Sequence, residues 1–414
     1  MSFLDKLSVE QRVLLGLVAK GVSDVPDAIE ISKSDLENAD WKAVATESIY
    51  QAVSLIAFDT ACGYKEYIPS EIYNGWLKMT GSVVSSNLRT AFAQSELVNL
   101  LNKNGRKYLI LKGLSAASAY KKPELRCLGD VDFLIDASEQ ESVENLLIGA
   151  GYNKWDEEDH ACHVVFKKPH AHLEMHFEIA GIPYGEKGKL VREYLDGAID
   201  KIQVKSMDGA SFNMPIPEIQ SAVLLLHMQH HMLGEGLGLR HLCDWSKFVD
   251  STIDQAFWQE KFLPFIEKIG LLTYAKVMTK VGAIYLGCKL PDWAKDADDN
   301  LCFEVVDDMF KNGNFGKKDK ERAMSGTLIS EHGKQGTKHG KLYNAFSVVH
   351  KSVLRKFPIV KKLVIIYPFL WLYVVGKYLF LTAIGKRPNL TKTILVATER
   401  KTIYDKLHVF ETEE

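Results

Sequence analysis

Two acidic residues, Asp130 and Asp132, have the type and spacing that metal-assisted chemistry requires. They lie in the segment GDVDFLI, where acidic and apolar residues alternate as they do on a β-strand. Residues two apart on a strand point to the same face, so the two carboxylates should lie side by side. Because burying unpaired ionised carboxylates is costly, this face cannot be core, and Val131, Phe133 and Ile135 should cover the packed face.

The spacing of these carboxylates suits divalent cations. Mg²⁺ prefers oxygen ligands and is commonly held by one or two carboxylates together with substrate phosphates. Two such ions, about 4 Å apart, can stabilise both the attacking and the leaving oxygen of a phosphoryl transfer. A D-x-D pattern also occurs on solvated strand faces, but a glycine turn upstream and a polar-faced strand downstream favour a metal site here.

A third acidic ligand is expected from a neighbouring strand. The segment HAHLEMHFE places His172, Glu174, His176 and Glu178 on one face, with apolar residues between them. We predict that Glu174 completes the metal site, with Glu178 as the reserve candidate. His176 and Glu178 are also candidates for the lining of the surrounding cleft.

A candidate phosphate-binding turn precedes the acidic strand. Residues 108–111 form a short apolar run typical of a buried strand, and Lys112 and Gly113 follow it. The turn from Gly113 to Ser115 should open a helix whose backbone N–H groups can contact phosphate oxygens. Lys112 and Arg126 would then neutralise the charge of a triphosphate. Glycine is common in such turns, so this signal is weaker than that of the acids.

Several histidines fall on one predicted helix, where His227 and His231 are four positions apart, a spacing compatible with a metal site. There is no H-E-x-x-H motif, and no third ligand is obvious, although His241 and Asp244 follow. We therefore expect these histidines to line the cleft that faces the sheet, with Asp244 orienting a histidine or the substrate. A satisfied structural network is the alternative interpretation.

The chain has 414 residues, enough for two or three domains of ordinary size. Hydrophobic residues make up 46% and charged residues 25%, which indicates a folded protein. The net charge of −2 gives no general preference for polyanions. The six cysteines form no C-x-x-C pair, and the N-terminal segment is broken by charges, so we expect a cytoplasmic protein without disulfides or a signal peptide.

The hydrophobic pattern predicts an α+β fold with four regions. Apolar residues three and four apart predict helices in the first region, including residues 40–63, and an alternating pattern predicts a small sheet in the second. Helices are expected again in the third region. The predicted boundaries are 1–104 for an N-terminal helical region, 105–216 for the α/β core, 217–345 for a helical domain that closes the cleft, and 346–414 for a tail.

The tail is basic, apolar and aromatic. Residues 363–384 are almost wholly apolar, and residues 351–401 contain eleven Lys or Arg against one acid, Glu399. Pro368 and Lys377 inside the apolar stretch favour a surface or buried helix over one that spans a bilayer. The alternatives are a buried or oligomeric helix, a membrane-surface helix that contacts anionic lipid, and a spanning or nucleic-acid-binding segment.

The central region also resembles a known family, the uncharacterised bacterial nucleotidyltransferases of the DNA polymerase β-like superfamily. The resemblance extends over residues 40–345 and includes the helical stretch LLLHMQHHMLGEGLGLRHLCDWSKFV. It implies a polymerase β-like core, two Mg²⁺ ions and a nucleoside triphosphate donor. Leu114 after the glycine and the long gap to the acids depart from the superfamily pattern. The residues that carry the resemblance are Leu111-Lys112-Gly113, Arg126, Asp130, Asp132, Glu174 and His176.

Together, these features predict an enzyme that moves a nucleoside monophosphate from a triphosphate to a hydroxyl and releases pyrophosphate. Asp130, Asp132 and Glu174 would hold the metal ions, and Glu174 would help to deprotonate the acceptor. The acceptor is an RNA, a protein or a small molecule, and residues 351–401 provide a candidate membrane contact. The alternatives are a catalytically degenerate nucleotide-binding module and a peripheral membrane scaffold.

Overall fold

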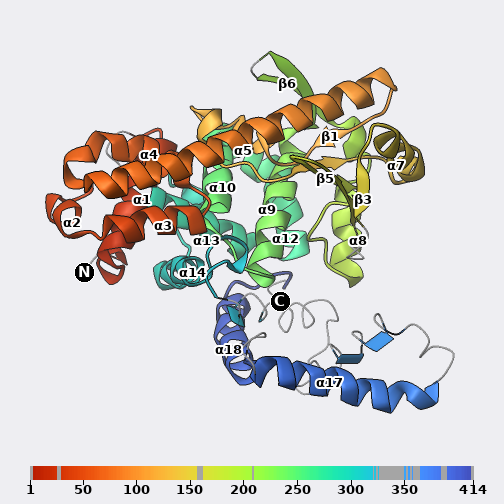
Figure 1. Ribbon diagram of the computed structural model, residues 1–414. Helices are drawn as coiled ribbons and strands as arrows, with labels where there is room; N and C mark the ends of the chain where they lie inside the picture. The colour runs from red at the N-terminus through yellow and green to blue at the C-terminus, as the bar shows by residue number, and fades with distance from the viewer. Residues whose placement is uncertain are drawn as a thin grey trace.

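The computed structural model has an α+β fold in which a small mixed sheet lies against a larger helical body (Figure 1). The expected class and the small mixed sheet are thus confirmed. The structure describes residues 3–25, 29–155, 162–207, 209–319, 321–322, 325, 349–350, 353–354, 357, 364–383 and 389–411. Its helices are α1 Val9–Val22, α2 Lys33–Asn38, α3 Trp41–Tyr50, α4 Ser54–Ala61, α5 Ser70–Lys103, α6 Leu114–Ala117, α7 Gln140–Gly149, α8 Gly185–Tyr194, α9 Pro217–Leu233, α10 Leu239–Thr252, α11 Gln255–Phe257, α12 Leu263–Ile269, α13 Leu272–Leu286, α14 Asp299–Asn312, α17 Tyr367–Ala383 and α18 Leu390–Lys406. Its strands are β1 Leu109–Ile110, β2 Val131–Leu134, β3 Asn153–Trp155, β4 His163–Lys168, β5 Ala171–His176, β6 Ile202–Met207 and β7 Ala210–Pro215.

The N-terminal helices form where the apolar pattern predicts them, but residues 40–63 form two helices, α3 and α4. Ala52 adopts a left-handed conformation between them, with a φ of 54°. The break points the buried side chain of Gln51 into the helical body. There Gln51 donates to the carbonyl of Met309 at 3.0 Å and accepts from the backbone N–H of Leu239 at 3.0 Å. These long-range hydrogen bonds explain a break that the local pattern does not show.

The main sheet has the strand order β1-β2-β5-β4-β3. Strands β2 and β5 are parallel, and their register places Asp132 beside Glu174. The other pairs are antiparallel. Strand β2 begins one residue after Asp130, and β5 ends two residues before Glu178. Both strands are therefore shorter in the structure than the sequence pattern predicts. Strand β3 and the separate β6–β7 hairpin were not expected.

One face of the sheet packs on the C-terminal part of α5 and on α7. Val131 and Phe133 of β2 are buried there beside Leu97 and Leu101 of α5, and Ile135 belongs to the same cluster. Burying an aliphatic or aromatic side chain of this size stabilises a fold by about 1.5–3 kcal/mol. The packed face expected from the alternating pattern is therefore confirmed, and it fixes which side chains of β2 point to the other face.

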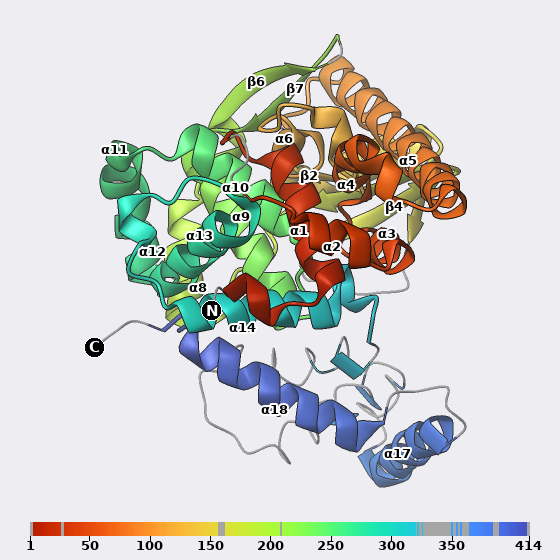
Figure 2. The ribbon, with the colours of Figure 1, turned by 90° about the vertical axis from the view of Figure 1, so that its left-hand side faces the viewer.

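The larger core joins the N-terminal helices to the helices that follow the sheet. Val18 of α1, Trp245 of α10, Tyr274 of α13 and Val305 of α14 lie in one cluster of buried residues. Trp76 from the first half of α5 belongs to the same cluster. Figure 2 shows α1 in front of α9, α10 and α13, and α5 at the upper right of the view. The 34-residue helix α5 thus contributes to both cores.

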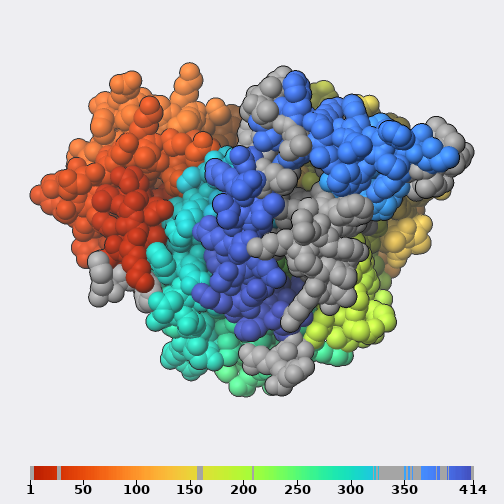
Figure 3. All heavy atoms as spheres, turned by 90° about the horizontal axis from the view of Figure 1, so that it is seen from below, coloured from red at the N-terminus to blue at the C-terminus, as the bar shows by residue number. Residues whose placement is uncertain are grey.

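The two C-terminal helices differ in their packing. Helix α18 lies against α14, and its Tyr404, with Leu407 just after its end, is buried in the larger core. Helix α17 lies beyond α18 at the lower edge of the molecule in Figure 1, and in Figure 3, the view from below, both helices face the viewer. Phe369, Leu372 and Phe380 of α17 are 70%, 63% and 63% exposed. Within the described part of the chain, no helix has the combination of length and apolar character that crossing a bilayer requires.

Candidate active site

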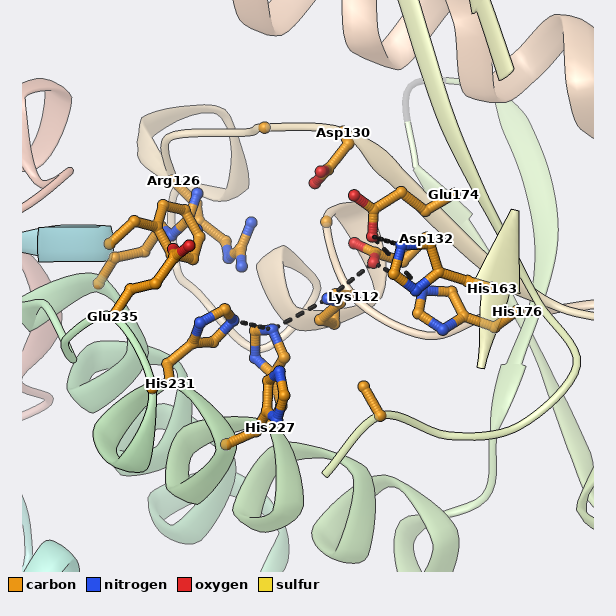
Figure 4. A pocket seen from close by; sticks show the side chains of 17 residues that line it. Lys112, Arg126, Asp130, Asp132, His163, Glu174, His176, His227, His231 and Glu235 are labelled. Carbon is orange, nitrogen blue, oxygen red and sulfur yellow. Dashed lines mark hydrogen bonds and ion pairs between the residues drawn. The ribbon is translucent and has the colours of Figure 1, made fainter. Parts of the chain in front are cut away.

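A cavity of about 390 Å³ lies between the sheet and the C-terminal half of α9. Figure 4 shows Asp132 and Glu174 on the sheet side, His227 and His231 on the helix side, and Lys112 between the two walls. The sheet side is the polar face of β2 and β5, opposite the face that packs on α5. The arrangement follows from the alternation of apolar and polar residues on these strands.

The three acids predicted from the sequence lie together. One carboxylate oxygen each of Asp130 and Glu174, with a ring nitrogen of His172, lie within 4.8 Å of one another. Asp132, Glu174 and His176 form a second group with the same spacing. The parallel register of β2 and β5 explains this proximity, because it aligns Asp132 with Glu174. Glu174 thus lies near both aspartates, and its role in completing a metal site stays a prediction.

Asp132 is buried, which corrects the expectation that this face lies outside the core. Its side chain is 3% exposed, and it is paired on two sides. The ammonium of Lys112 lies 2.7 Å from Oδ1, and Nε2 of His176 lies 3.1 Å from the same oxygen. Burial alone would raise the pKa of Asp132, but Lys112 and His176 lower it well below its ordinary value. Counter-charges within the protein allow this carboxylate to be buried in its ionised form.

The pKa values of Glu174 and His176, which lie beside Asp132, are raised, whereas that of Asp132 is lowered. Burial, and then the charges of Asp132 and Asp130, raise the pKa of Glu174. Burial would lower the pKa of His176, but its hydrogen bond to Asp132 raises it well above the ordinary value. His176 Nε2 also lies 3.6 Å from Glu174. His176 thus connects the two carboxylates that the strand register aligns.

Lys112 joins the acids to the histidines. Besides Asp132, its Nζ contacts Nε2 of His227 at 2.9 Å. Burial would lower the pKa of Lys112, but Asp132, Asp130 and Glu174 raise it, so the ammonium stays charged. Lys112 thus bridges the acidic side and the histidine side of the cavity.

The glycine turn contributes less to the cavity than expected. Gly113 lines it and has a φ of 64°, a conformation that favours glycine over other residues. The helix that follows, α6, has only four residues. Ser115 is buried, its hydroxyl donates to Oε1 of Gln220 at 3.4 Å, and it lines a different cavity. Its side chain therefore does not face the acids.

Arg126 and Asp244 form a buried ion pair. The guanidinium donates from Nε and Nη2 to the two carboxylate oxygens, each at 2.7 Å, and the hydroxyl of Tyr120 donates to the same carboxylate at 2.7 Å. Both charged side chains are about 5% exposed. Asp244 thus orients an arginine and a tyrosine and not a histidine. Arg126 lies at the edge of the cavity, where its charge is already neutralised.

The reserve acid, Glu178, lies outside this arrangement. It is ion-paired with Arg192 of α8 at 2.6 Å and does not line the cavity. The difference from Glu174 follows from the end of β5 at His176, after which the alternation of faces no longer applies.

At the helix side of the cavity lie Arg240, which the sequence analysis did not name, and, behind the cavity wall, His241, which it named only as following the histidine pair. His241 lies beside His227 and His231, so a third histidine completes the pair that was four positions apart. Burial lowers the pKa of all three well below the ordinary value, and Lys112 and the neighbouring histidines add to the effect for His227. Arg240 also lines the cavity and has no ion pair among the described residues. In the sequence, Arg240 and His241 stand next to each other, and this adjacency is the feature that could have pointed to both residues.

The chain matches the family model described as uncharacterised nucleotidyltransferase over residues 37–286. This range is more than half of the chain and includes the sheet and helices α5 to α10, so the protein belongs to this family. Membership supports nucleotidyl transfer as the general activity and implies a nucleoside triphosphate as substrate. Neither a curated protein nor a solved structure matches the chain.

Proposed function

We propose that the protein transfers a nucleoside monophosphate from a triphosphate to a hydroxyl, with Asp130, Asp132 and Glu174 holding Mg²⁺. The observation that supports the metal site is the convergence of these carboxylates at the aligned strands β2 and β5. Oxygen ligands in this number suit Mg²⁺ better than a softer metal. When bound, two such ions would neutralise the charge that develops on the reacting phosphate.

The side chains around the acids have complementary roles in this proposal. Glu174, whose pKa is raised by burial, accepts the proton of the attacking hydroxyl. Lys112 leaves Asp132 for the phosphates, because cations at the acids would replace its charge. Arg240, a partly buried cation that lines the cavity, contributes to the same charge neutralisation. Arg126 is a positioning residue, since Asp244 occupies its guanidinium.

The activity can be tested without knowing the acceptor. Purified protein is incubated with α-labelled nucleoside triphosphates, Mg²⁺ and a cell extract, and the fraction that gains label is identified after RNase or protease treatment. We expect Glu174→Gln to abolish labelling. Glu178→Gln is the matched control, because Glu178 follows the same strand but pairs with Arg192 outside the cavity. Equal labelling by the Glu174→Gln variant and the unmodified protein would contradict the proposal.

The non-catalytic alternative makes a different prediction. A degenerate module would bind ATP with similar affinity in the presence and absence of Mg²⁺ and would give no labelled product. The proposed enzyme should bind the triphosphate more tightly with Mg²⁺, because three carboxylates face the same cavity and repel a metal-free polyphosphate. Titration calorimetry with and without Mg²⁺ separates these outcomes.

We also propose that α17 lies on an anionic membrane surface. Its exposed Phe369, Leu372 and Phe380 provide apolar contact area, and the basic residues of 351–401 provide attraction to acidic headgroups. Flotation with phosphatidylserine vesicles should be reduced by the double substitution of Phe369 and Phe380 by serine. Leu395→Ser on α18, where Leu395 is 65% exposed, is the control that should float normally. Equal flotation of both variants would contradict this placement.

A further inference from the structure

Three histidines in the cavity wall form a second cluster with the composition of a metal site. His227 and His231 lie one turn apart on α9, and His241 lies on the first turn of α10. One ring nitrogen from each lies within 4.8 Å of the other two. Nε2 of His227 is only 2.7 Å from Nε2 of His231, and the ring centroids of His231 and His241 are 5.1 Å apart.

The burial of this cluster is not compensated by hydrogen bonds. His241 is 2% exposed, and neither of its ring nitrogens has a hydrogen-bond partner among the described residues. His227 is 9% exposed, and the partners of its Nε2 are another histidine and a lysine. Buried polar groups are nearly always satisfied, so an unsatisfied nitrogen beside two other imidazoles indicates a missing ligand.

The loop between α9 and α10 is shaped to bring these histidines together. A Cβ on Gly238 would lie 2.6 Å from Cβ of Asn314, so only glycine permits the close approach of the two backbones. Phe315, which follows Asn314, has a φ of 58°. In this left-handed conformation its ring packs 4.7 Å from His231 and 5.7 Å from His241. Such strain in a non-glycine residue is concentrated at functional sites, and here it covers the imidazoles with an apolar ring.

We propose that His227, His231 and His241 bind a divalent transition metal of the Zn²⁺ type, at a site separate from the Mg²⁺ ligands. Imidazole suits Zn²⁺, whereas the carboxylates of the sheet suit Mg²⁺. Three protein ligands are the usual number at zinc sites that keep an open position. His227 and His231 line the cavity and His241 lies behind them, so the open side of this cluster is the cavity. This proposal does not depend on the transfer activity.

Lys112 couples this histidine cluster to the acids. Its ammonium contacts Nε2 of His227 and would be repelled by a cation bound there. Asp132, 2.7 Å away on the other side, is the alternative partner. Metal at the histidine cluster would therefore direct Lys112 toward the acids.

The test measures metal content and binding on the full chain. Protein purified without chelator is expected to contain about one equivalent of zinc, and the chelated protein should show a visible Co²⁺ absorption band that Zn²⁺ removes. His231→Gln and His241→Gln should weaken Zn²⁺ binding by more than about 100-fold, the upper limit for loss of a second-shell partner. His230→Gln is the matched control, because His230 lies on the same turn and lines the same cavity.

Glu174→Gln distinguishes the two sites, since Glu174 belongs to both acidic groups and not to the group of His227, His231 and His241. Retention of zinc in this variant supports the histidine site, and its loss would assign the zinc to the acids and overturn the proposal. Because His241 is buried, circular dichroism shows whether the His241→Gln variant folds. If it does not fold, Zn²⁺ binding by the His231→Gln variant, at a half-buried position, is the test. Failure of the unmodified protein to bind Zn²⁺ would also overturn it.

Discussion

Two buried ion pairs, Arg126–Asp244 and Lys112–Asp132, lie near the same cavity but differ in how completely they are satisfied. Arg126 contacts both oxygens of Asp244, and Tyr120 donates a third hydrogen bond to that carboxylate. Lys112 makes one contact with Asp132 and another with His227. Asp132 in turn shares one oxygen between Lys112 and the ring of His176.

The difference indicates a division of roles. The saturated pair anchors the connection between β1 and β2 to helix α10, far apart in the sequence, and leaves no group for a ligand. The pair at the acids has a shared oxygen and an ammonium with two different partners, an arrangement that suits exchange with a cation or a phosphate. A buried ion pair of the same charge types can therefore serve the fold in one place and ligand binding in another.

The largest expected loss of stability follows from breaking the pair of Arg126 and Asp244, whose hydrogen bonds are all made within the protein. Asp244→Ala leaves the guanidinium of Arg126 buried without a counter-charge, and removing one partner of such a pair costs about 3–5 kcal/mol. Urea titration should show this loss in the free energy of unfolding. A loss below about 1 kcal/mol would show that water reaches Arg126 and that the pair does not anchor the loop.

Asp132→Asn should mainly affect activity. We expect transfer to fall by more than about 100-fold, because this change removes a metal ligand and not only a second-shell partner. The loss of stability should be smaller than for Asp244→Ala, since Lys112 still has Asp130 and Glu174 near it. Labelling assays measure the activity and urea titration measures the stability of the same preparation. A stability loss equal to that of Asp244→Ala would contradict the difference in role between the two ion pairs.

His176→Gln should have an intermediate effect. The glutamine amide can still donate a hydrogen bond to Asp132 but carries no charge, so we expect a loss of about 10–100-fold in activity, as for other second-shell partners of metal ligands. The apparent Mg²⁺ requirement should rise in the same assay. Unchanged Mg²⁺ dependence would indicate that His176 has a structural role alone.

The smallest effect is expected at Arg12–Asp35, where a similar bidentate pair lies near the surface, with side chains 25% and 16% exposed. Asp35→Asn should cost about 0–1 kcal/mol at neutral pH. The hydrogen bond from Arg12 lowers the pKa of Asp35, so the contribution is complete above the ordinary aspartate pKa of about 4 and disappears as the pH falls through the lowered value. Unfolding of both proteins at several pH values checks this, and a difference that grows in acid would contradict it.

The sequence predicted those features that depend on local alternation. The acidic face of β2 and the packed face with Phe133 both follow from a period of two along a strand. The same period places Glu174 and Glu178 on one face, and only the end of β5 at His176 separates them. The pairing of Arg126 with Asp244 and the third histidine, His241, depend on how α10 packs, and no local pattern contains that information. The proposed domain boundaries and the polymerase β-like core stay predictions.

The burial of Asp132 illustrates the same limit. From the sequence, two acids on one face indicated solvent, because the positive charges that compensate Asp132 come from Lys112, twenty positions earlier, and His176, more than forty positions later. The break between α3 and α4 has a similar origin in the contacts of Gln51 with α10 and α14. Long-range partners decide these features, and a single sequence does not show them.

Helix α5 has a consequence for how substrates enter. With 34 residues it is about 50 Å long, and it is anchored at Trp76 in one core and at Leu97 and Leu101 in the other. A hinge between sheet and helical body would have to bend this rod or detach one of its ends. Admission of a nucleotide should therefore occur by movement of short segments at the rim, such as residues 234–238, while the distance between the two walls stays constant.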